Sequence, residues 1–329
     1  MAVPVTSGVT GFTQSAFDLI SAALRLCNVI SEEEVPTASM AQRTLEALNA
    51  MATGWQASGI HVWTSVESIL FVQPGQTQYL LGSGSTDHAC LFSDLAQSRL
   101  SFTADAGASS VLVTSIAGLA AGDNFGIQLD AGVNFWTTIV GTPAGSTVTL
   151  ADALPSAATG EAITFGYGAG LLRPLRVPAA RRYIYASGIQ NNITVLSQQD
   201  YDQLPNPFQT GQINQFFYQP TTGNGVYSEP LGQFNVWQTP ADYYAGVRFI
   251  SQRPLQNFVT LADIPDFPAE WTATLRWNLA LEIAPEYDVP IERVELIRAK
   301  ATEWFARASS WDREPQPILF GMAMSPGYR

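Results

Sequence analysis

Hydrophobic positions in the first sixty residues recur at helical spacing in two segments, residues 15–29 and 37–59. The apolar positions are Phe17, Ile20, Leu24 and Cys27 in the first segment and Ala41, Leu45, Leu48, Ala52 and Trp55 in the second. Steps of three and four place these side chains on one face of each helix. Thr37 is a typical N-cap residue and Gly59 a typical C-cap residue for the second helix. We therefore expect a helical hairpin whose apolar faces are buried.

The pattern changes to β-type sequence after this hairpin. Residues 66–72 and 77–81 are rich in β-branched and aromatic side chains, and the Pro74–Gly75 pair between them predicts a turn, so we expect a β-hairpin. Between residues 84 and 168 the sequence has no helical period, and short β-rich runs follow one another. These runs are residues 111–114, 125–129, 135–140, 147–150 and 162–165. Their spacing of about ten residues is typical of a small β-sandwich or barrel.

The remaining chain combines strands with helices. Its β-rich runs are residues 182–185, 193–196, 215–219, 232–237 and 243–250. Ser197 is placed to cap a short helix that carries Asp200 and Leu204. Two longer helices are predicted to begin near Pro268 and Pro290, because proline is favoured in the first helical turn. The apolar face of the last helix consists of Val294, Ile297, Ala301, Trp304, Phe305 and Ala308.

These patterns predict an α+β protein: a helical bundle with an antiparallel β-sheet, plus an inserted all-β domain of sandwich or barrel type. Residues 1–82 and 170–310 are expected to form a discontinuous core. Residues 84–168 are expected to be the inserted domain, since insertions are tolerated at loop tips. Residues 311–329 contain three prolines and two glycines, which predict an extended C-terminal arm instead of a helix.

Residues 275–287 (LRWNLALEIAPEY) raise the question of catalysis. The stretch is apolar almost all round, with Glu282 inside it and Pro285 and Glu286 at its end. Two carboxylates four positions apart share a helix face, and a glycoside hydrolase needs two carboxylates. However, Pro285 interrupts the helix between them. Because buried carboxylates are normally paired, we interpret Glu282 as a structural tie between helices, with Arg25 as the candidate partner.

The other polar residues do not indicate a catalytic, cofactor-binding or metal site. His61 and His88 have neither metal-ligand spacing nor a nucleophile motif beside them. Cys27 and Cys90 show no metal or disulfide spacing, so we interpret them as buried thiols. We therefore expect a protein that is not an enzyme and that uses no cofactor.

Charge argues against a protein that holds nucleic acid tightly. The net charge is −12, from 28 acidic residues against 16 basic ones. Affinity for phosphate backbones comes from lysine and arginine, and Lys300 is the single lysine. A negative wall would instead suit a conduit through which DNA passes without specific binding. There is also no run of about 18 apolar residues, so no membrane-spanning helix is expected.

The C-terminal arm carries large apolar residues that cannot form a core of their own. They are Trp311, Ile318, Leu319, Phe320, Met322 and Met324, and Trp304 lies on the helix before them. Apolar anchors on a segment that becomes ordered on binding are a recurrent docking mode. We expect this arm to bind another protein, with folding back onto its own chain as the alternative.

Several segments give this chain a resemblance to a known family. They are residues 16–26 (AFDLISAALRL), 36–38 (PTA), 45–51 (LEALNAM), 55–60 (WQASGI), 62–63 (VW) and 275–287. With them the sequence resembles the head-to-tail connector proteins (adaptor, head-completion) of tailed bacteriophages, and especially the tail accessory factors of short-tailed phages. The likeness covers residues 13–82 and 172–310. The insert resembles a module that some of these proteins carry and compact members lack, through residues 122–130 (GDNFGIQLD), 136–138 (WTT) and 148–150 (VTL).

The resemblance implies a structural virion protein. Such proteins form a homo-oligomeric ring, commonly a dodecamer, between the portal and the tail, and DNA leaves the capsid through the ring. The C-terminal helix and arm would then bind the portal protein, and the opposite face would receive the tail nozzle or tail tube protein. The implied location is the head–tail interface of the virion, after synthesis in the cytoplasm of the bacterial host.

Two other functions stay open at the level of sequence. One is a virion-associated cell-wall glycan hydrolase that uses Glu282 or the acids of the insert. The other is a binding module in which the β domain contacts glycans or decorates the tail.

Overall fold

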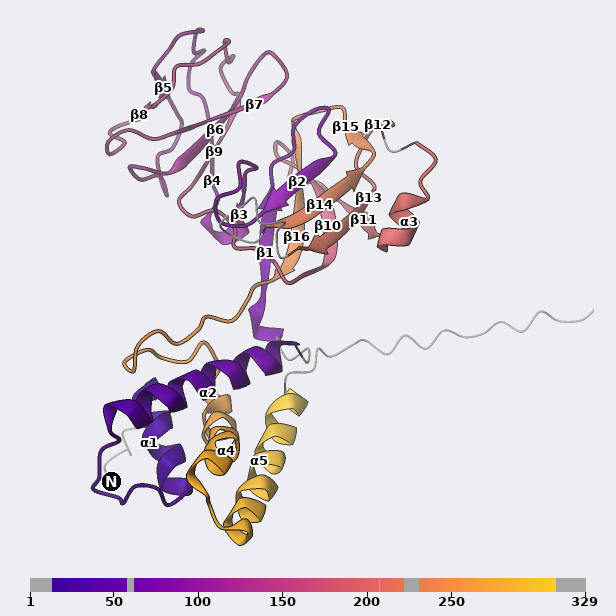
Figure 1. Cartoon of the computed structure of the whole chain (residues 1–329). Coiled ribbons are helices and arrows are strands. Elements are labelled where there is room, and N and C mark those ends of the chain that lie inside the picture. Colours follow the sequence, from indigo (N-terminus) through magenta and orange to yellow (C-terminus); the bar gives the residue numbers. More distant parts are fainter. Residues whose placement is uncertain (1–13, 58–61, 207, 222–230, 312–329) are drawn as a thin grey trace, which may run out of the picture. The chain divides into compact units, whose positions relative to one another are not determined.

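The computed structural model describes residues 14–57, 62–206, 208–221 and 231–311 (Figure 1). These parts contain five α-helices and a large β-sheet with further small sheets, which confirms the predicted α+β class. No helix in these parts is both long enough and apolar enough to cross a membrane.

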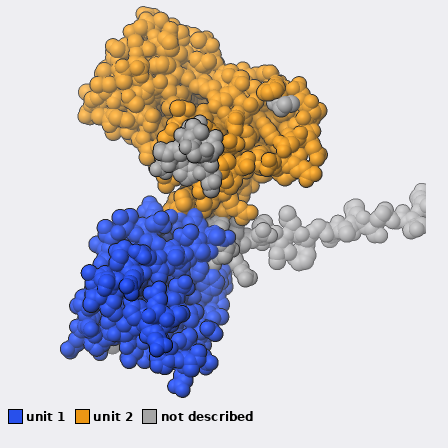
Figure 2. All heavy atoms as spheres, viewed as in Figure 1, with its two compact units in different colours: residues 1–63, 255–329 blue, residues 64–254 orange. Residues whose placement is uncertain are grey.

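The chain divides into two compact units, shown in different colours in Figure 2. Met1–Trp63 and Leu255–Arg329 belong to a helical unit, and Thr64–Pro254 forms a β unit. This division differs from the predicted one, in which the helices shared a core with the sheet. The reason is that the helices bury their apolar faces against one another, whereas the sheet has an apolar cluster of its own.

The helical unit is built from two segments at opposite ends of the chain. Its elements are α1 (Ala16–Leu26), α2 (Ala38–Ala57), η1 (Val62–Thr64), η3 (Ala269–Trp271), α4 (Thr272–Ile283), η4 (Ala284–Tyr287) and α5 (Ile291–Trp311). Ser15 begins α1 with a capping box, since its hydroxyl accepts from the Asp18 backbone N–H and the Asp18 carboxylate accepts from the Ser15 N–H. Thr37 caps α2, as predicted, by accepting a hydrogen bond from the Met40 N–H.

The core of the helical unit lies between α1, α2, α4 and α5. Its fully buried members include Leu19, Ile20, Leu24, Leu48, Leu275, Leu279 and Ile283. A second group in this unit consists of aromatic rings whose centroids lie 5.2 to 6.2 Å apart. It contains Trp55, Trp63, Phe267, Trp271 and Phe305. Aromatic groups of this size bury a large area, so they hold the start of α4 against α2 and α5.

An eight-stranded sheet is the centre of the β unit. Its order is β2 (Gln78–Leu81), β14 (Gly232–Trp237), β13 (Gln215–Pro220), β11 (Gln190–Val195), β10 (Arg176–Ile184), β16 (Ala245–Gln252), β1 (Ser65–Leu70) and β3 (Ala89–Leu91). The pairs are antiparallel except for β11 with β13. The short helix α3 (Gln198–Asp202) is capped by Ser197 as predicted, and β12 (Thr210–Gly211) pairs with β15 (Thr239–Pro240).

The predicted hairpin of residues 66–72 and 77–81 is wrong, although both strands exist. β1 pairs with β16 and β3, whereas β2 pairs with β14. The turn at Pro74 and Gly75 therefore carries the chain away from β1 instead of folding it back. Local sequence could not predict this, because β16, the partner of β1, and β14, the partner of β2, are both about 150 residues or more distant along the chain.

The insert folds around its own apolar cluster. Its strands are β4 (Ala96–Arg99), β5 (Ser110–Leu112), β6 (Asn124–Gln128), β7 (Asn134–Thr138), β8 (Thr147–Thr149) and β9 (Ile163–Tyr167). Four pair in the order β4–β9–β6–β7, and β5 pairs with β8. The bridges Ile139–Leu150 and Leu100–Val113 continue β7 into β8 and β5 into β4, so the six strands close in a barrel-like order. Phe125, Ile127 and Val148 are fully buried inside.

Aromatic side chains join this barrel to the large sheet. Phe71, which follows β1, and Tyr185, which follows β10, contact Phe165 of β9, with ring centroids 4.9 and 4.6 Å apart. Cys90 and Ile69 are buried in the same cluster. The barrel therefore covers part of one sheet face, and the two β parts belong to one compact unit.

Candidate functional site

Glu282 is exposed in the structure, and so is Arg25. The interpretation of this pair as a buried tie between helices is therefore wrong. The residues that α4 does bury are Thr274, Leu275, Leu279, Ala280 and Ile283, whereas Glu282, next to the end of the helix, is exposed. Glu286 is exposed too, on η4 after the end of α4. Because the sequence of α4 is apolar almost all round, it does not indicate which of its residues face solvent.

Other contacts tie α1 to α4 and α5. Arg293 of α5 donates from Nε to the carbonyl oxygen of Leu26, 2.7 Å away, at the end of α1. The Cys27 thiol donates to the carbonyl oxygen of Ala280, with a sulfur–oxygen distance of 3.2 Å. Both acceptors are backbone groups, so no pattern of opposite charges in the sequence indicates these contacts.

Both cysteines are free, buried thiols, as predicted. Burial raises the pKa of Cys27 to about 11 and that of Cys90 to about 12. A thiol is a nucleophile or metal ligand in its deprotonated form, so these two groups are chemically inert near neutral pH.

The proposed portal-binding residues are only partly within the described chain. Trp304 is half-buried on α5; the carbonyl oxygen of Trp304 accepts from Thr274 Oγ1, and the Arg307 guanidinium lies 5.1 Å from the Trp304 ring centroid. Trp311 is the last residue of α5. The remaining arm residues lie outside the described residues: Ile318, Leu319, Phe320, Met322 and Met324.

The exposed side of α5 carries apolar groups before the arm begins. Ile291 is 69% exposed and Leu296 60% exposed, whereas Ile297 and Ala301 are buried against α4 as predicted. Exposed large aliphatic groups are not unusual singly, and these two lie in the first turns of α5.

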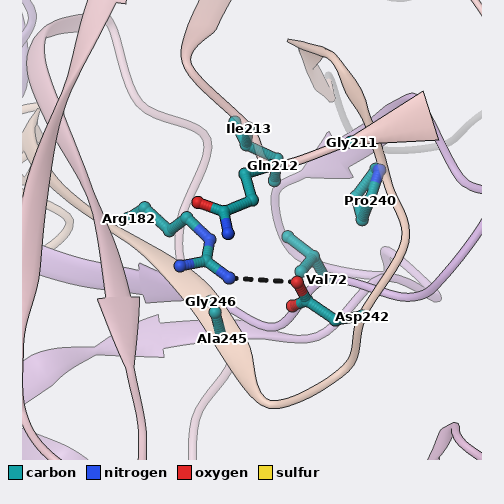
Figure 3. Close-up of a pocket in the computed structure, with 9 residues that line it drawn as sticks. All are labelled: Val72, Arg182, Gly211, Gln212, Ile213, Pro240, Asp242, Ala245 and Gly246. Carbon is teal, nitrogen blue, oxygen red and sulfur yellow. Dashed lines mark hydrogen bonds and ion pairs between the residues drawn. The ribbon is translucent and has the colours of Figure 1, made fainter. Parts of the chain in front are cut away.

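A buried ion pair lies at one end of the large sheet (Figure 3). Arg182 of β10 is 4% exposed, and its guanidinium donates to the Asp242 carboxylate at 3.0 Å. Figure 3 shows these two groups facing each other in a small pocket that Gln212, Ile213 and other residues line. Burying a charge is costly unless it is paired, so we interpret this pair as a structural contact that positions the chain before β16.

A second hollow, of about 200 Å³, lies where the chain enters and leaves the barrel. Asp87, His88, Asn124 and Tyr167 are among its lining residues. His88 Nδ1 and the Tyr167 hydroxyl are 2.7 Å apart, and the imidazole stacks on the Trp136 ring with centroids 4.0 Å apart. Burial lowers the pKa of His88 to about 4, so this imidazole is neutral at neutral pH.

The carboxylate in this hollow, Asp87, is engaged in hydrogen bonds. The Asp87 carboxylate accepts hydrogen bonds from Gln76 Nε2 and from the Leu80 backbone N–H, so it holds the loop. Within the described parts of the chain, no group of three or more His, Cys, Asp or Glu side chains gathers in a way that could hold a metal ion. His61 lies outside the described residues.

Comparisons with known proteins do not add to this picture. No description of a protein family matches the sequence, and no curated protein matches it.

Proposed function

We propose that this protein is a structural component of a bacteriophage virion that forms a ring between the portal and the tail and completes the channel for DNA exit. Support comes first from the resemblance to connector proteins, which rests on segments from both ends of the chain. In the structure these segments belong to one compact unit: α1, α2 and α4 pack around a common core. The segments that resemble connector proteins therefore belong to a single folded unit.

The observation that carries the proposal is that α5 is packed on one side, exposed on another, and followed in sequence by the apolar arm. This helix packs on α4 through Ile297 and Ala301, exposes Leu296, and leads directly to the apolar arm that begins after Trp311. An ordered helix followed by apolar anchors is suited to docking on another chain. The arm and the exposed side of α5 would bind the portal, and a distal tail protein would bind elsewhere on the ring.

The channel role fits the charge of the protein. With a net charge of −12, a ring of many copies has an excess of negative charge that repels phosphate backbones. DNA would pass through such a ring without specific binding. By the resemblance, the ring has twelve copies, and the inserted β domain of residues 84–168 is an accessory to it.

Truncation after Ser310 tests the proposed portal contact. We expect the truncated protein to fold, because the described core ends at α5, and to lose binding to rings of the portal protein from the same phage. The measurement is co-sedimentation with portal rings, followed by electron microscopy. Undiminished binding by the truncated protein would exclude the arm as the docking element.

A second candidate role for the barrel, as a binding or decorating module, is supported by one observation. Phe102 is 67% exposed on the barrel surface, and Val140 is also exposed. Deleting the barrel is a poor test, because it would uncover Phe71 and Tyr185 of the sheet. We suggest Phe102→Ser with Val140→Ser instead: rings that assemble normally but lose a tail or glycan contact would identify the barrel as a decoration.

A further inference from the structure

One strand of the large sheet is basic in an otherwise acidic protein. Between Glu161 and Asp200 the sequence contains four arginines and no acidic residue. Three of the four lie on β10, where Arg182 is buried against Asp242 and Arg176 and Arg181 are exposed. The fourth is Arg173, just before the strand. The exposed positive charge of β10 therefore comes from Arg176 and Arg181.

Arg181 borders a shallow hollow formed by β1, β10 and β16 of the large sheet. The hollow is lined by Glu67 of β1, by Ala179, Ala180 and Arg181 of β10, and by Arg248, Phe249 and Ile250 of β16. Ile250 is 36% exposed in it. The surface thus combines cationic groups with an apolar group, which is the composition of a site for a chain segment that is both acidic and apolar.

The charges in this hollow are unequally compensated. Arg248 pairs with Glu67, and its guanidinium lies 3.7 Å from the centroid of the Phe92 ring. Arg181 donates to Gln190 Oε1, a neutral acceptor, at 3.3 Å. Among the described residues, no ion pair involves Arg176 or Arg181. The hollow, which we term the β10 hollow, retains a net positive charge. Because the Glu67 carboxylate in this hollow would repel a phosphate backbone, the hollow is better suited to binding a peptide than a nucleic acid.

The loop between α1 and α2 has the complementary composition. Glu32, Glu33 and Glu34 are consecutive and exposed, and Val35 beside them is 67% exposed. The Glu34 carboxylate accepts from the Ser31 backbone N–H at 3.2 Å, which orders the loop from within. This loop, residues 31–35, is termed the acidic loop.

We propose that the acidic loop of one copy binds the β10 hollow of a neighbouring copy. The glutamates would pair with Arg176 and Arg181, and Val35 would contact Ile250. Because the two surfaces are different, the contact is head-to-tail, and such contacts generate rings when the rotation closes. This inference rests on the proposed ring and identifies the surfaces through which neighbouring copies join.

Charge reversal on each side separately provides a sharp test. One variant carries Glu32→Arg with Glu33→Arg, and the other carries Arg176→Glu with Arg181→Glu. Each alone should weaken self-association at least tenfold in analytical ultracentrifugation, since like charges then meet. An equimolar mixture should regain wild-type assembly, because a basic loop meets an acidic hollow at one contact and the native pair forms at the next. The control is Glu282→Arg with Glu286→Arg, an equal charge change at exposed positions elsewhere.

The possible outcomes separate this contact from the ring itself. If the wild type assembles and both loop and hollow variants assemble equally well, the ring survives and this contact is wrong. A loss in each variant without recovery in the mixture also overturns the contact. If the wild type stays monomeric at every concentration, with and without portal rings, then both the ring and the contact fail. Circular dichroism establishes that each variant is folded.

Discussion

The imidazole of His88 and the hydroxyl of Tyr167 share a hydrogen bond, with 2.7 Å between His88 Nδ1 and the Tyr167 oxygen. His88 precedes β3 of the large sheet, and Tyr167 is the last residue of β9 in the barrel. The bond therefore connects the two segments through which the chain enters and leaves the barrel. A neutral imidazole is part of this connection, because burial lowers the pKa of His88 to about 4.

The pKa of His88 predicts a loss of stability in acid. A histidine whose folded pKa lies below its unfolded value of 6.5 binds protons more readily when unfolded, so its contribution is complete above pH 6.5 and is lost as the pH falls toward 4. We expect wild type to lose on the order of 2–3 kcal/mol more than His88→Gln between neutral pH and about pH 4. Urea denaturation at several pH values measures the difference. Parallel curves for the two proteins would contradict the assignment.

Replacement of glycine by alanine is expected to have opposite effects on stability at two positions, Gly126 and Gly54. A Cβ atom on Gly126 of β6 would lie 2.7 Å from the Trp136 ring, whereas one on Gly54 of α2 would meet nothing within 4 Å. Gly126→Ala should destabilise the β unit by about 1–3 kcal/mol through overpacking. Gly54→Ala should stabilise the helical unit by roughly 0.5–1 kcal/mol, because alanine favours a helix. Thermal unfolding followed by calorimetry tests both; effects of equal sign would refute the packing argument.

Arg293→Gln is expected to weaken the attachment of α5 to α1. The guanidinium of Arg293 donates to the Leu26 carbonyl oxygen at 2.7 Å, and loss of such a bond costs about 1 kcal/mol. The matched control is Arg298→Gln, which removes another exposed arginine from the same helix. Chemical denaturation should show a lower midpoint for the first variant than for the second. Equal midpoints would show that the contact adds no stability.

Glu282→Gln is expected to fold and assemble normally. Because the Glu282 side chain is exposed, its neutralisation should change the free energy of unfolding by less than about 0.5 kcal/mol. The measurements are denaturation, ring formation, and lysis of purified cell walls. Loss of cell-wall lysis with intact rings would support the glycan hydrolase instead, and failure to fold would contradict the expected neutral effect of this substitution.

The predictions that depended on local pattern were largely confirmed by the structure. The capped helix α2, the apolar face of α5 and the five β-rich runs of the insert all occur near their expected positions. These features depend on side-chain periodicity and on the residues at element ends, both of which are present in a short window of sequence. The two cysteines also followed their general preference for burial.

Only the tertiary structure decided which elements meet. β1 finds its partner in β16 and not in β2, although a turn sequence joins β1 to β2. Glu282 is exposed in the structure. The sequence could not predict this, because a helix that is apolar almost all round does not reveal which side its neighbours cover. Arg293, Cys27 and His88 make their contacts with a backbone carbonyl or a distant ring, and no spacing along the chain encodes such partners. Secondary structure is thus set by neighbours in sequence, whereas burial and pairing are set by neighbours in space.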